Sequence, residues 1–321
     1  MKFKKFLPII GIFLLVYLIY KIGLISLFNT IKYANLFYIL LGLILTPVFI
    51  LPLGYKWYKI LKLQGFTNIN FYYIMKLYYI GAFYGFITPA RAGSLIRAYY
   101  LKEKTKKGLI ECASSIVIER ILDLLTIFSI AFVGSLIFLN KSDVNVTSLL
   151  IISFITLLIL IFIFMRKSRG IFILSFIYNY LLPKNIREKA DTSLNQFYDS
   201  LPKLRKLIFI FSLTILTWVG LYFQTYIFAI AFHINVPFHI FMTFSSIGTI
   251  IATLPISISG LGTRELTLIT LFSLYNVTPE SIISMSLSSF FGIGLIEALT
   301  GLFFIYKGDK NEILDYNTIS P

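Results

Sequence analysis

Long runs of apolar residues dominate this sequence and limit what it can fold into. A run of about twenty such residues lets a helix cross the roughly 30 Å hydrocarbon core of a bilayer. Only 13% of the residues are charged, against about 25% in soluble domains. We therefore predict an all-α polytopic membrane bundle, a single domain over residues 1–306 followed by a polar tail at 307–321. The runs expected to span the membrane are 6–28, 36–54, 110–138, 149–165, 207–232 and 281–306.

Two further apolar segments, 71–100 and 238–277, are interrupted by proline and glycine. Such breaks free backbone N–H and C=O groups that hydrocarbon cannot bond, so the broken backbone must be buried in protein or line a polar cavity. We expect each segment to form a re-entrant hairpin of two broken helices. The two hairpins would enter from opposite sides and belong to an inverted repeat, a design that places such breaks near a transport site.

Lysine and arginine gather beside the apolar runs, as expected for cytoplasmic loops. If segment 71–100 returns to the side from which it enters, the basic clusters on both sides of it are cytoplasmic; the first of them is Lys56, Lys59 and Lys62. The loop 166–206 has nine Lys or Arg against three Asp or Glu, which favours the same side. Within it, residues 171–182 form either an interfacial amphipathic piece or a solvated linker. We expect a plasma-membrane protein with cytoplasmic N- and C-termini.

The net charge of +15 resides largely in these flanking clusters. We therefore attribute it to membrane topology and expect no nucleic-acid partner. The chain has one cysteine and two histidines, which argues against a metal site, and nothing in the sequence indicates a cofactor. No nucleophile paired with a base is apparent, so we expect the protein not to be an enzyme.

A polar stretch at 88–97 marks the turn of the first expected hairpin. Pro89 ends one half-helix, and Gly93 lets the backbone reverse or approach a ligand closely. The next half-helix would present free N–H groups to an anion, while Arg91 and Arg97 add forked donors. This arrangement outlines a phosphate or carboxylate site. The alternative is a cytoplasmic loop whose arginines only anchor headgroups.

Three ionisable residues lie in the middle of the next expected span. Glu119 and Asp123 are four residues apart and share a helix face, with Arg120 beside them. A charge at the centre of a spanning helix costs about 2.5–3.5 kcal/mol on insertion scales, so these residues must be paired. They form either a structural knot of ion pairs, with Arg91 or Arg97, or part of a transport pathway or relay.

The second broken segment has the same pattern of proline, glycine and charged residues. Pro255 ends a half-helix, Gly260 and Gly262 supply a flexible turn, and Arg264 and Glu265 place charge where the next half-helix begins. The last span carries a further acid. We therefore expect substrate to be bound by residues of both hairpins and of the spans that follow them: Arg91, Gly93, Arg97, Glu119, Arg120, Asp123, Gly260, Gly262, Arg264, Glu265 and Glu297.

Taken in order, these motifs resemble the lysylphosphatidylglycerol synthase transmembrane family, a flippase-like domain also described as UPF0104 membrane proteins. The resemblance covers nearly the whole chain. Members that synthesise aminoacylated lipids fuse this domain to a soluble aminoacyltransferase, and some archaeal relatives fuse it to a glycosyltransferase. We find no long soluble segment here, so the resemblance implies lipid translocation rather than synthesis. It rests on Pro89-x-Arg91-x-Gly93 with Arg97, Glu119-Arg120-x-x-Asp123, and Pro255 through Gly260-x-Gly262-x-Arg264-Glu265.

The resemblance implies a flippase for a phosphate-bearing lipid, aminoacylated or isoprenoid-linked. Arg91, Arg97 and Arg264 would meet the headgroup, and the acids would hold those arginines in place or bind a coupling proton. The expected partners are membrane lipids and a soluble lipid-modifying enzyme. Two other classes stay open: a secondary transporter of a small polar solute, and a membrane-embedded lipid-modifying enzyme or a subunit of one.

One position departs from the family pattern. Many relatives have an acid directly after the glycine of the first motif, where this chain has Ser94. If that acid balances Arg91 in the relatives, then Glu119 or Asp123 takes over this task here.

Overall fold

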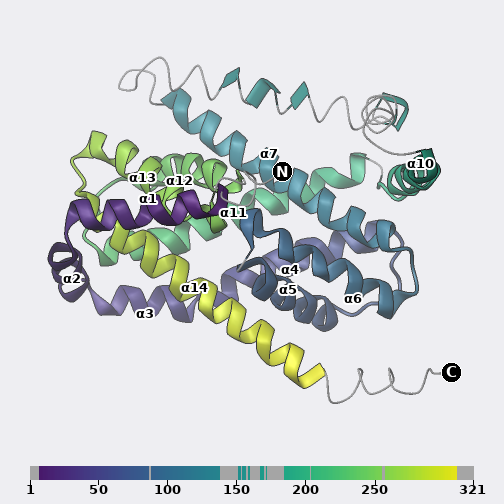
Figure 1. Cartoon of the computed structure of the whole chain (residues 1–321), viewed down its shortest axis with the longest axis horizontal. Helices are drawn as coiled ribbons and strands as arrows, with labels where there is room; N and C mark the ends of the chain where they lie inside the picture. Colours follow the sequence, from purple (N-terminus) through teal and green to yellow (C-terminus); the bar gives the residue numbers. More distant parts are fainter. Residues whose placement is uncertain are drawn as a thin grey trace.

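The computed structural model describes residues 7–86, 88–137, 151–152, 154–156, 158–159, 167–169, 171, 184–202, 204–254 and 257–308. All regular structure within these residues is helical (Figure 1). In chain order the elements are α1 (Leu7–Ile22), α2 (Leu24–Lys32), α3 (Leu36–Ile44), α4 (Thr46–Leu63), α5 (Phe71–Phe86), η2 (Pro89–Leu95), α6 (Ile96–Thr105), α7 (Leu109–Ile137), α10 (Lys184–Asp199), α11 (Leu204–Ala231), α12 (Phe238–Thr253), η3 (Ile258–Gly260), α13 (Thr263–Phe272), η4 (Ser273–Tyr275) and α14 (Pro279–Gly308), where η marks a 3₁₀ turn.

Among the described residues, three helical stretches are long and apolar enough to cross a membrane: Leu36–Leu63, Arg205–Ala231 and Pro279–Lys307. They coincide with three of the predicted spans. The predicted span 110–138 is the single helix α7. The predicted span 149–165, the piece 171–182 and the tail lie mostly outside the described residues, so the number of crossings stays a prediction.

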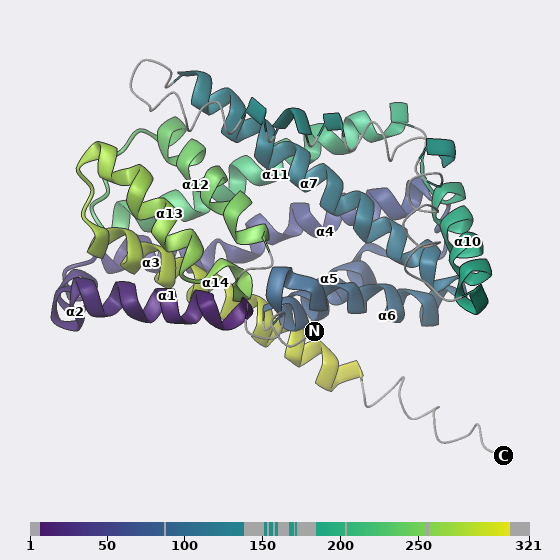
Figure 2. The ribbon, with the colours of Figure 1, turned by 45° about the horizontal axis from the view of Figure 1, so that its top comes forward.

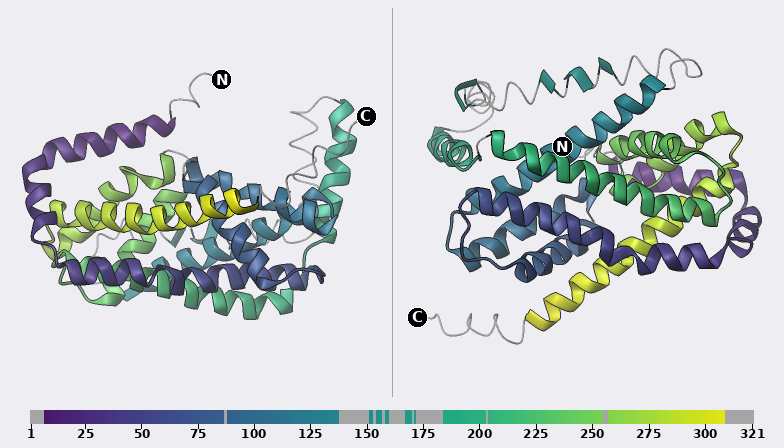
Figure 3. Two further views of the ribbon diagram at one scale, coloured as in Figure 1. Left: turned by 90° about the horizontal axis from the view of Figure 1, so that it is seen from below. Right: turned by 180° about the vertical axis from the view of Figure 1, so that it is seen from behind.

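The expected first span, 6–28, is not one straight helix. Its two apolar pieces, Phe13–Ile22 and Leu24–Lys32, meet at an angle of 80°. Gly23 lies between them with φ 92°, a backbone conformation that glycine adopts without strain and that ends a helix. The left panel of Figure 3 shows α1 turning sharply into α2 at this point.

Both broken segments fold back on themselves, as the sequence predicts. The Tyr73 hydroxyl, near the start of α5, donates to the Tyr100 carbonyl in α6 at 3.1 Å. In the second segment the Phe244 ring of α12 packs against Phe272, the last residue of α13, with centroids 5.1 Å apart. The two segments are therefore helical hairpins, and the membrane side from which each enters stays a prediction.

The turns of the two hairpins are tight and touch each other. In the first, a Cβ on Gly93 would lie only 2.2 Å from the Tyr84 carbonyl oxygen, so no larger residue fits this approach. In the second, Gly260 and Gly262 both have φ 82°, which again favours glycine. Turns η2 and η3 are in contact, with the Ser259 hydroxyl 3.3 Å from the carbonyl oxygen that ends α5.

Each hairpin packs on the long helix of the other half of the chain. Helix α5 of the first hairpin packs against α14, and α12 of the second packs against α7. Helices α4 and α11, which precede the hairpins, pack against each other, and Figure 3 (right) shows them side by side. Figure 2 shows α4, α7 and α11 together in the middle of the bundle. The hairpin turns therefore meet near its centre.

Many large apolar side chains lie on the outer surface of the bundle. A surface of this kind suits lipid rather than water, because it has no polar partners to offer. The interior is also mostly apolar, but several polar and charged side chains are buried within it, which is uncommon unless such groups are paired. Examples of the exposed apolar residues are Phe13, Tyr20, Ile25, Ile44, Leu216, Leu299 and Phe303.

Candidate functional site

Four charged side chains are buried together where α4, α6 and α7 meet. Lys56 Nζ contacts Asp123 Oδ1 and lies 3.9 Å from Glu119 Oε1. Arg97 Nη2 donates to Glu119 Oε2 at 2.7 Å. All four are buried, and two cations face two carboxylates, so no charge is left without a partner in a low-dielectric interior. We call these four residues the α7 charge cluster.

The Arg97 side chain packs against two aromatic rings and a glycine in addition to its ion pair. Its guanidinium lies 4.4 Å from the ring centre of Trp57 and 5.1 Å from that of Tyr78, an arrangement that stabilises a cation. Its side chain crosses α5 at Gly81, where a Cβ would lie 2.6 Å from Arg97 Cγ. The structure therefore contains the ion-pair knot between Glu119 and Arg97 that the sequence leaves as one of two alternatives.

Sequence reasoning missed the burial of Lys56. It grouped this lysine with Lys59 and Lys62 in a cytoplasmic cluster, but Lys56 is fully buried, and the membrane side of the cluster stays a prediction. The reason is that α4 continues to Leu63 and keeps Lys56 on the same helix face as Leu53 and Ile60, both buried. Lys56 follows Leu53 by three residues and precedes Ile60 by four, which is the spacing of one helix face. This spacing was the signal available in the sequence.

Arg120 is the cation of this region that lacks a carboxylate partner within the described residues. Its Nη2 donates to the Ser94 hydroxyl at 2.8 Å, and the side chain is exposed to the interior space described below. A hydroxyl can accept from a guanidinium but cannot neutralise it. Arg120 therefore keeps a full positive charge to offer to an anion.

The second hairpin holds its own ion pair. Arg264 Nη2 donates to Glu265 Oε1 at 2.7 Å, and the Ser286 hydroxyl donates to the same oxygen at 2.7 Å. The other carboxylate oxygen accepts from the N–H of Gly262 and so caps α13. Glu265 is fully buried, whereas the Arg264 side chain is 20% exposed. Its exposed part faces the same interior space.

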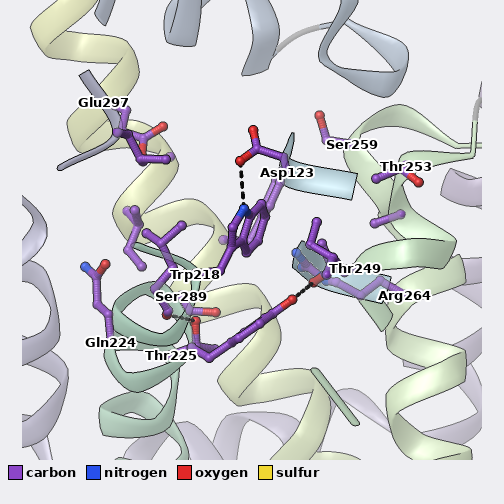
Figure 4. A pocket seen from close by; sticks show the side chains of 18 of the residues that line it. Asp123, Trp218, Gln224, Thr225, Thr249, Thr253, Ser259, Arg264, Ser289 and Glu297 are labelled. Atoms are coloured by element: carbon purple, nitrogen blue, oxygen red, sulfur yellow. Dashed lines mark hydrogen bonds between the residues drawn. The ribbon is translucent and has the colours of Figure 1, made fainter. Parts of the chain in front are cut away.

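A cavity of about 410 Å³ lies between the two hairpins and the helices α4, α7, α11 and α14. Its charged lining residues are Arg120, Asp123, Arg264 and Glu297. Figure 4 shows these groups around a common space, except Arg120, together with hydroxyl and aromatic side chains of α11 and α12. Asp123 also accepts from the indole N–H of Trp218 at 2.8 Å, so the α7 charge cluster forms part of the wall.

A smaller chamber of about 50 Å³ adjoins this cavity near the first turn. Arg97, Glu119 and Ser94 line it, so the buried part of the charge cluster reaches this chamber. The two spaces share wall residues, which are Tyr78, Arg120, Asp123 and Glu297. The shared wall links the first turn to the main cavity.

The predicted site residues thus fall into three groups. Four line the main cavity (Arg120, Asp123, Arg264 and Glu297), and Arg97, Glu119 and Glu265 hold positions behind or beside them. Gly93, Gly260 and Gly262 shape the turns. Pro89 and Arg91 belong to η2, but their side chains lie outside the described part of the structure, as does all of Pro255. The substrate-binding role of each remains a prediction.

Sequence reasoning missed the contribution of α11. Trp218, Tyr222 and Thr225 all line the cavity, and their spacing of four and three residues puts them on one helix face. This polar stripe within an apolar span was the available signal. Gln224, also in the wall, bonds to the Gly42 carbonyl at 2.9 Å and so ties α11 to α3.

Comparison with known proteins places these features in a family. The sequence model described as "Lysylphosphatidylglycerol synthase TM region" matches residues 7–301. Two UPF0104 membrane proteins of Methanocaldococcus jannaschii are similar: one is 26% identical over 278 residues, 81% of each chain. The other is 28% identical over 242 residues, which cover 70% of this chain and 97% of the relative. The resemblance stated from the motifs is confirmed, and the chain belongs to the family of the lysylphosphatidylglycerol synthase transmembrane region.

Proposed function

We propose that this protein is a lipid translocase that moves a phosphate-bearing lipid between the leaflets of a membrane, without forming or breaking covalent bonds. The observation that carries the proposal is a cavity with Arg120 and other charged side chains in its wall, inside a bundle that has many large apolar side chains on its outer surface. A headgroup in such a cavity would be shielded from hydrocarbon while its acyl chains remain in the lipid. The family membership supports a role in lipid metabolism or transport.

The charges around the cavity support an anionic headgroup. Lys56 and Arg97 are already matched by Glu119 and Asp123. Arg120 donates only to a hydroxyl among the described residues, and Arg264 reaches the cavity from its pair with Glu265. Guanidinium groups bind phosphate through forked donors. We therefore assign the phosphate to Arg120 and Arg264.

The contact pattern supports an inverted repeat. If α4 to α7 are set equal to α11 to α14, the hairpin α5–α6 corresponds to α12–α13. The contact of α5 with α14 then becomes that of α12 with α7, and the contacts α4 with α11 and η2 with η3 each map onto themselves. A two-fold axis produces this behaviour, and transporters of this design alternate access around a site at the repeat interface.

The setting of the protein is part of the proposal. We place the protein in the plasma membrane, and the distribution of Lys and Arg supports cytoplasmic termini. A soluble enzyme that modifies the lipid would act before or after the translocation step. The lipid modified by such an enzyme could be aminoacylated or isoprenoid-linked.

The test is lipid movement by the purified protein in liposomes that contain fluorescent phospholipids or a polyprenyl phosphate. We expect transbilayer movement by the wild type and a loss of about tenfold or more in Arg120→Gln, because charge-assisted bonds to phosphate contribute about 1.5–3 kcal/mol. Arg205→Gln, the same change at an exposed position at the start of α11, serves as the matched control. Movement of no lipid by folded protein would overturn the proposal, and uptake of a water-soluble phosphate ester instead would indicate a solute transporter.

A further inference from the structure

One wall of the main cavity is made of hydroxyl groups from three different helices. They are Thr225 of α11, Thr249 of α12 and Ser289 of α14. The charged groups described above do not include them, yet Figure 4 shows all three in the wall beside Trp218. Their number and their origin in separate helices give the cavity a polar but uncharged side.

These hydroxyls face the cavity as hydrogen-bond acceptors. Each donates its proton to a carbonyl of its own helix: Thr225 to Leu221 at 3.0 Å, Thr249 to Ser245 at 2.8 Å and Ser289 to Ser286 at 3.1 Å. A hydroxyl has one proton to donate and two lone pairs. What remains available to a ligand is therefore the oxygen, which requires a donor on the ligand. The Thr249 oxygen also accepts from the Tyr222 hydroxyl at 3.4 Å, which leaves it one lone pair.

The charges in the cavity decide which kind of donor suits this wall. Asp123 already accepts from Lys56 and from Trp218, so its negative charge is matched from within the protein. Glu297 is the other carboxylate in the lining. The three hydroxyl oxygens carry no charge, and a cationic amine buried against neutral acceptors would lose more hydration than it regains. Neutral O–H groups pair with such acceptors without that loss.

The remaining features fit a headgroup larger than a phosphate. A volume of about 410 Å³ lies in the range of about 300–1,000 Å³ typical of small-molecule sites. Trp218 and Tyr222, whose ring centres are 5.6 Å apart, add flat apolar surface between the hydroxyls and the charge cluster. The cavity thus has a cationic part, an apolar platform and an acceptor wall.

We propose that the headgroup carried by this protein is a polyol or sugar joined to the lipid through a phosphate. This inference rests on the proposed translocase function. The phosphate binds Arg120 and Arg264, and the hydroxyls of the polyol donate to Thr225, Thr249 and Ser289. A bare phosphate monoester leaves the acceptor wall unused. Of the two lipid classes proposed above, an aminoacylated headgroup fits this wall less well, because it brings an ammonium charge that the wall does not match.

The test compares headgroups on lipids with identical fluorescent acyl chains in liposomes containing the full-length protein. We expect phosphatidylinositol to move about tenfold faster than phosphatidic acid and phosphatidylethanolamine. Each hydrogen bond to a neutral partner contributes about 0.5–1.5 kcal/mol, so the triple variant Thr225→Val/Thr249→Val/Ser289→Ala should slow phosphatidylinositol about tenfold or more and leave phosphatidic acid unchanged. The single variant Thr249→Val should slow it about threefold.

The matched control is Thr270→Val, on the exposed face of α13. Its hydroxyl donates to the Leu266 carbonyl at 3.0 Å, so the same helix bond is lost outside the cavity, and the headgroup preference should not change. Equal rates for all three lipids, or a preference that survives the triple and the single variants, would overturn the inference and leave the translocase function standing. If no lipid moves at all, the translocase function itself fails, and the inference fails with it.

Discussion

The two broken hairpins hold their buried charges in different ways. In the first, Arg97 of α6 pairs with Glu119 of α7, which also faces Lys56 of α4. In the second, Arg264 pairs with its own neighbour Glu265, and the backbone of the preceding turn completes the contact. The first arrangement depends on the relative positions of three helices. The second lies mostly within one hairpin, and among the described residues it contacts another helix through Ser286 and Phe290 of α14.

This difference indicates how each hairpin can move. Displacing α6 from α7 would separate opposite charges in a buried setting, which costs several kcal/mol. Displacing α13 from α14 breaks the hydrogen bond from Ser286 and the contact of the Arg264 guanidinium with the Phe290 ring, but it keeps the ion pair intact. We therefore expect the first hairpin to be the fixed part of the bundle and the second to be the part that moves more easily. The predictions below test that contrast.

The largest effect is expected for Glu119→Gln. The change leaves Arg97 buried without an acid and Lys56 with Asp123 alone. We expect the free energy of unfolding to fall by about 3–5 kcal/mol, the usual cost of removing one partner of a buried pair. Denaturant unfolding in detergent micelles measures it. Adding Arg97→Met should recover part of the loss, because neither charge then stays buried alone, and a loss in the double variant equal to the sum of the singles would contradict this.

A smaller effect is expected for Glu265→Gln. Arg264 loses its acid, but its side chain reaches the cavity and keeps some access to water. The lost bonds to a charged group are together worth about 1.5–3 kcal/mol, which the same unfolding experiment would detect. If Glu265→Gln costs as much as Glu119→Gln, the second hairpin is not self-contained and the contrast above fails.

The turn of the first hairpin allows a third comparison. In Gly93→Ala the new Cβ would meet the Tyr84 carbonyl oxygen, and a backbone atom has little freedom to give way. We expect a loss of about 1–2 kcal/mol from overpacking. Gly108→Ala is the control, because a Cβ there meets nothing within 4 Å. Equal thermal stability of the two variants would show that the turn is looser than the contact indicates.

The smallest effect is expected outside the buried cluster, on the same helix. Glu111 of α7 pairs with Lys107 at 2.6 Å, and both side chains are about a third exposed. Exposed pairs of this spacing contribute about 0.3–0.5 kcal/mol. Glu111→Gln should therefore lower stability by less than about 0.5 kcal/mol, and a loss of several kcal/mol would mean that burial does not explain the cost of Glu119→Gln.

The sequence predicted the parts of the fold that have local signals. The two hairpins follow from proline and glycine within apolar runs, and the shared face of Glu119 and Asp123 follows from their spacing. The spacing of Lys56 with Leu53 and Ile60 was a local signal of its burial, but its pairing with Asp123 had none, because the two residues are 67 positions apart. The hydroxyl wall was missed for the same reason, since its members come from three helices and only packing brings them together.

The two tryptophans of the chain have an optical consequence. Trp57 lies against the Arg97 guanidinium and donates its indole N–H to Ser115, and Trp218 donates its own to Asp123. All tryptophan fluorescence of this protein therefore originates from indoles in contact with the α7 charge cluster. Emission wavelength and quenching report directly on that cluster, so unlabelled protein and a spectrometer are enough to detect a headgroup that reaches it.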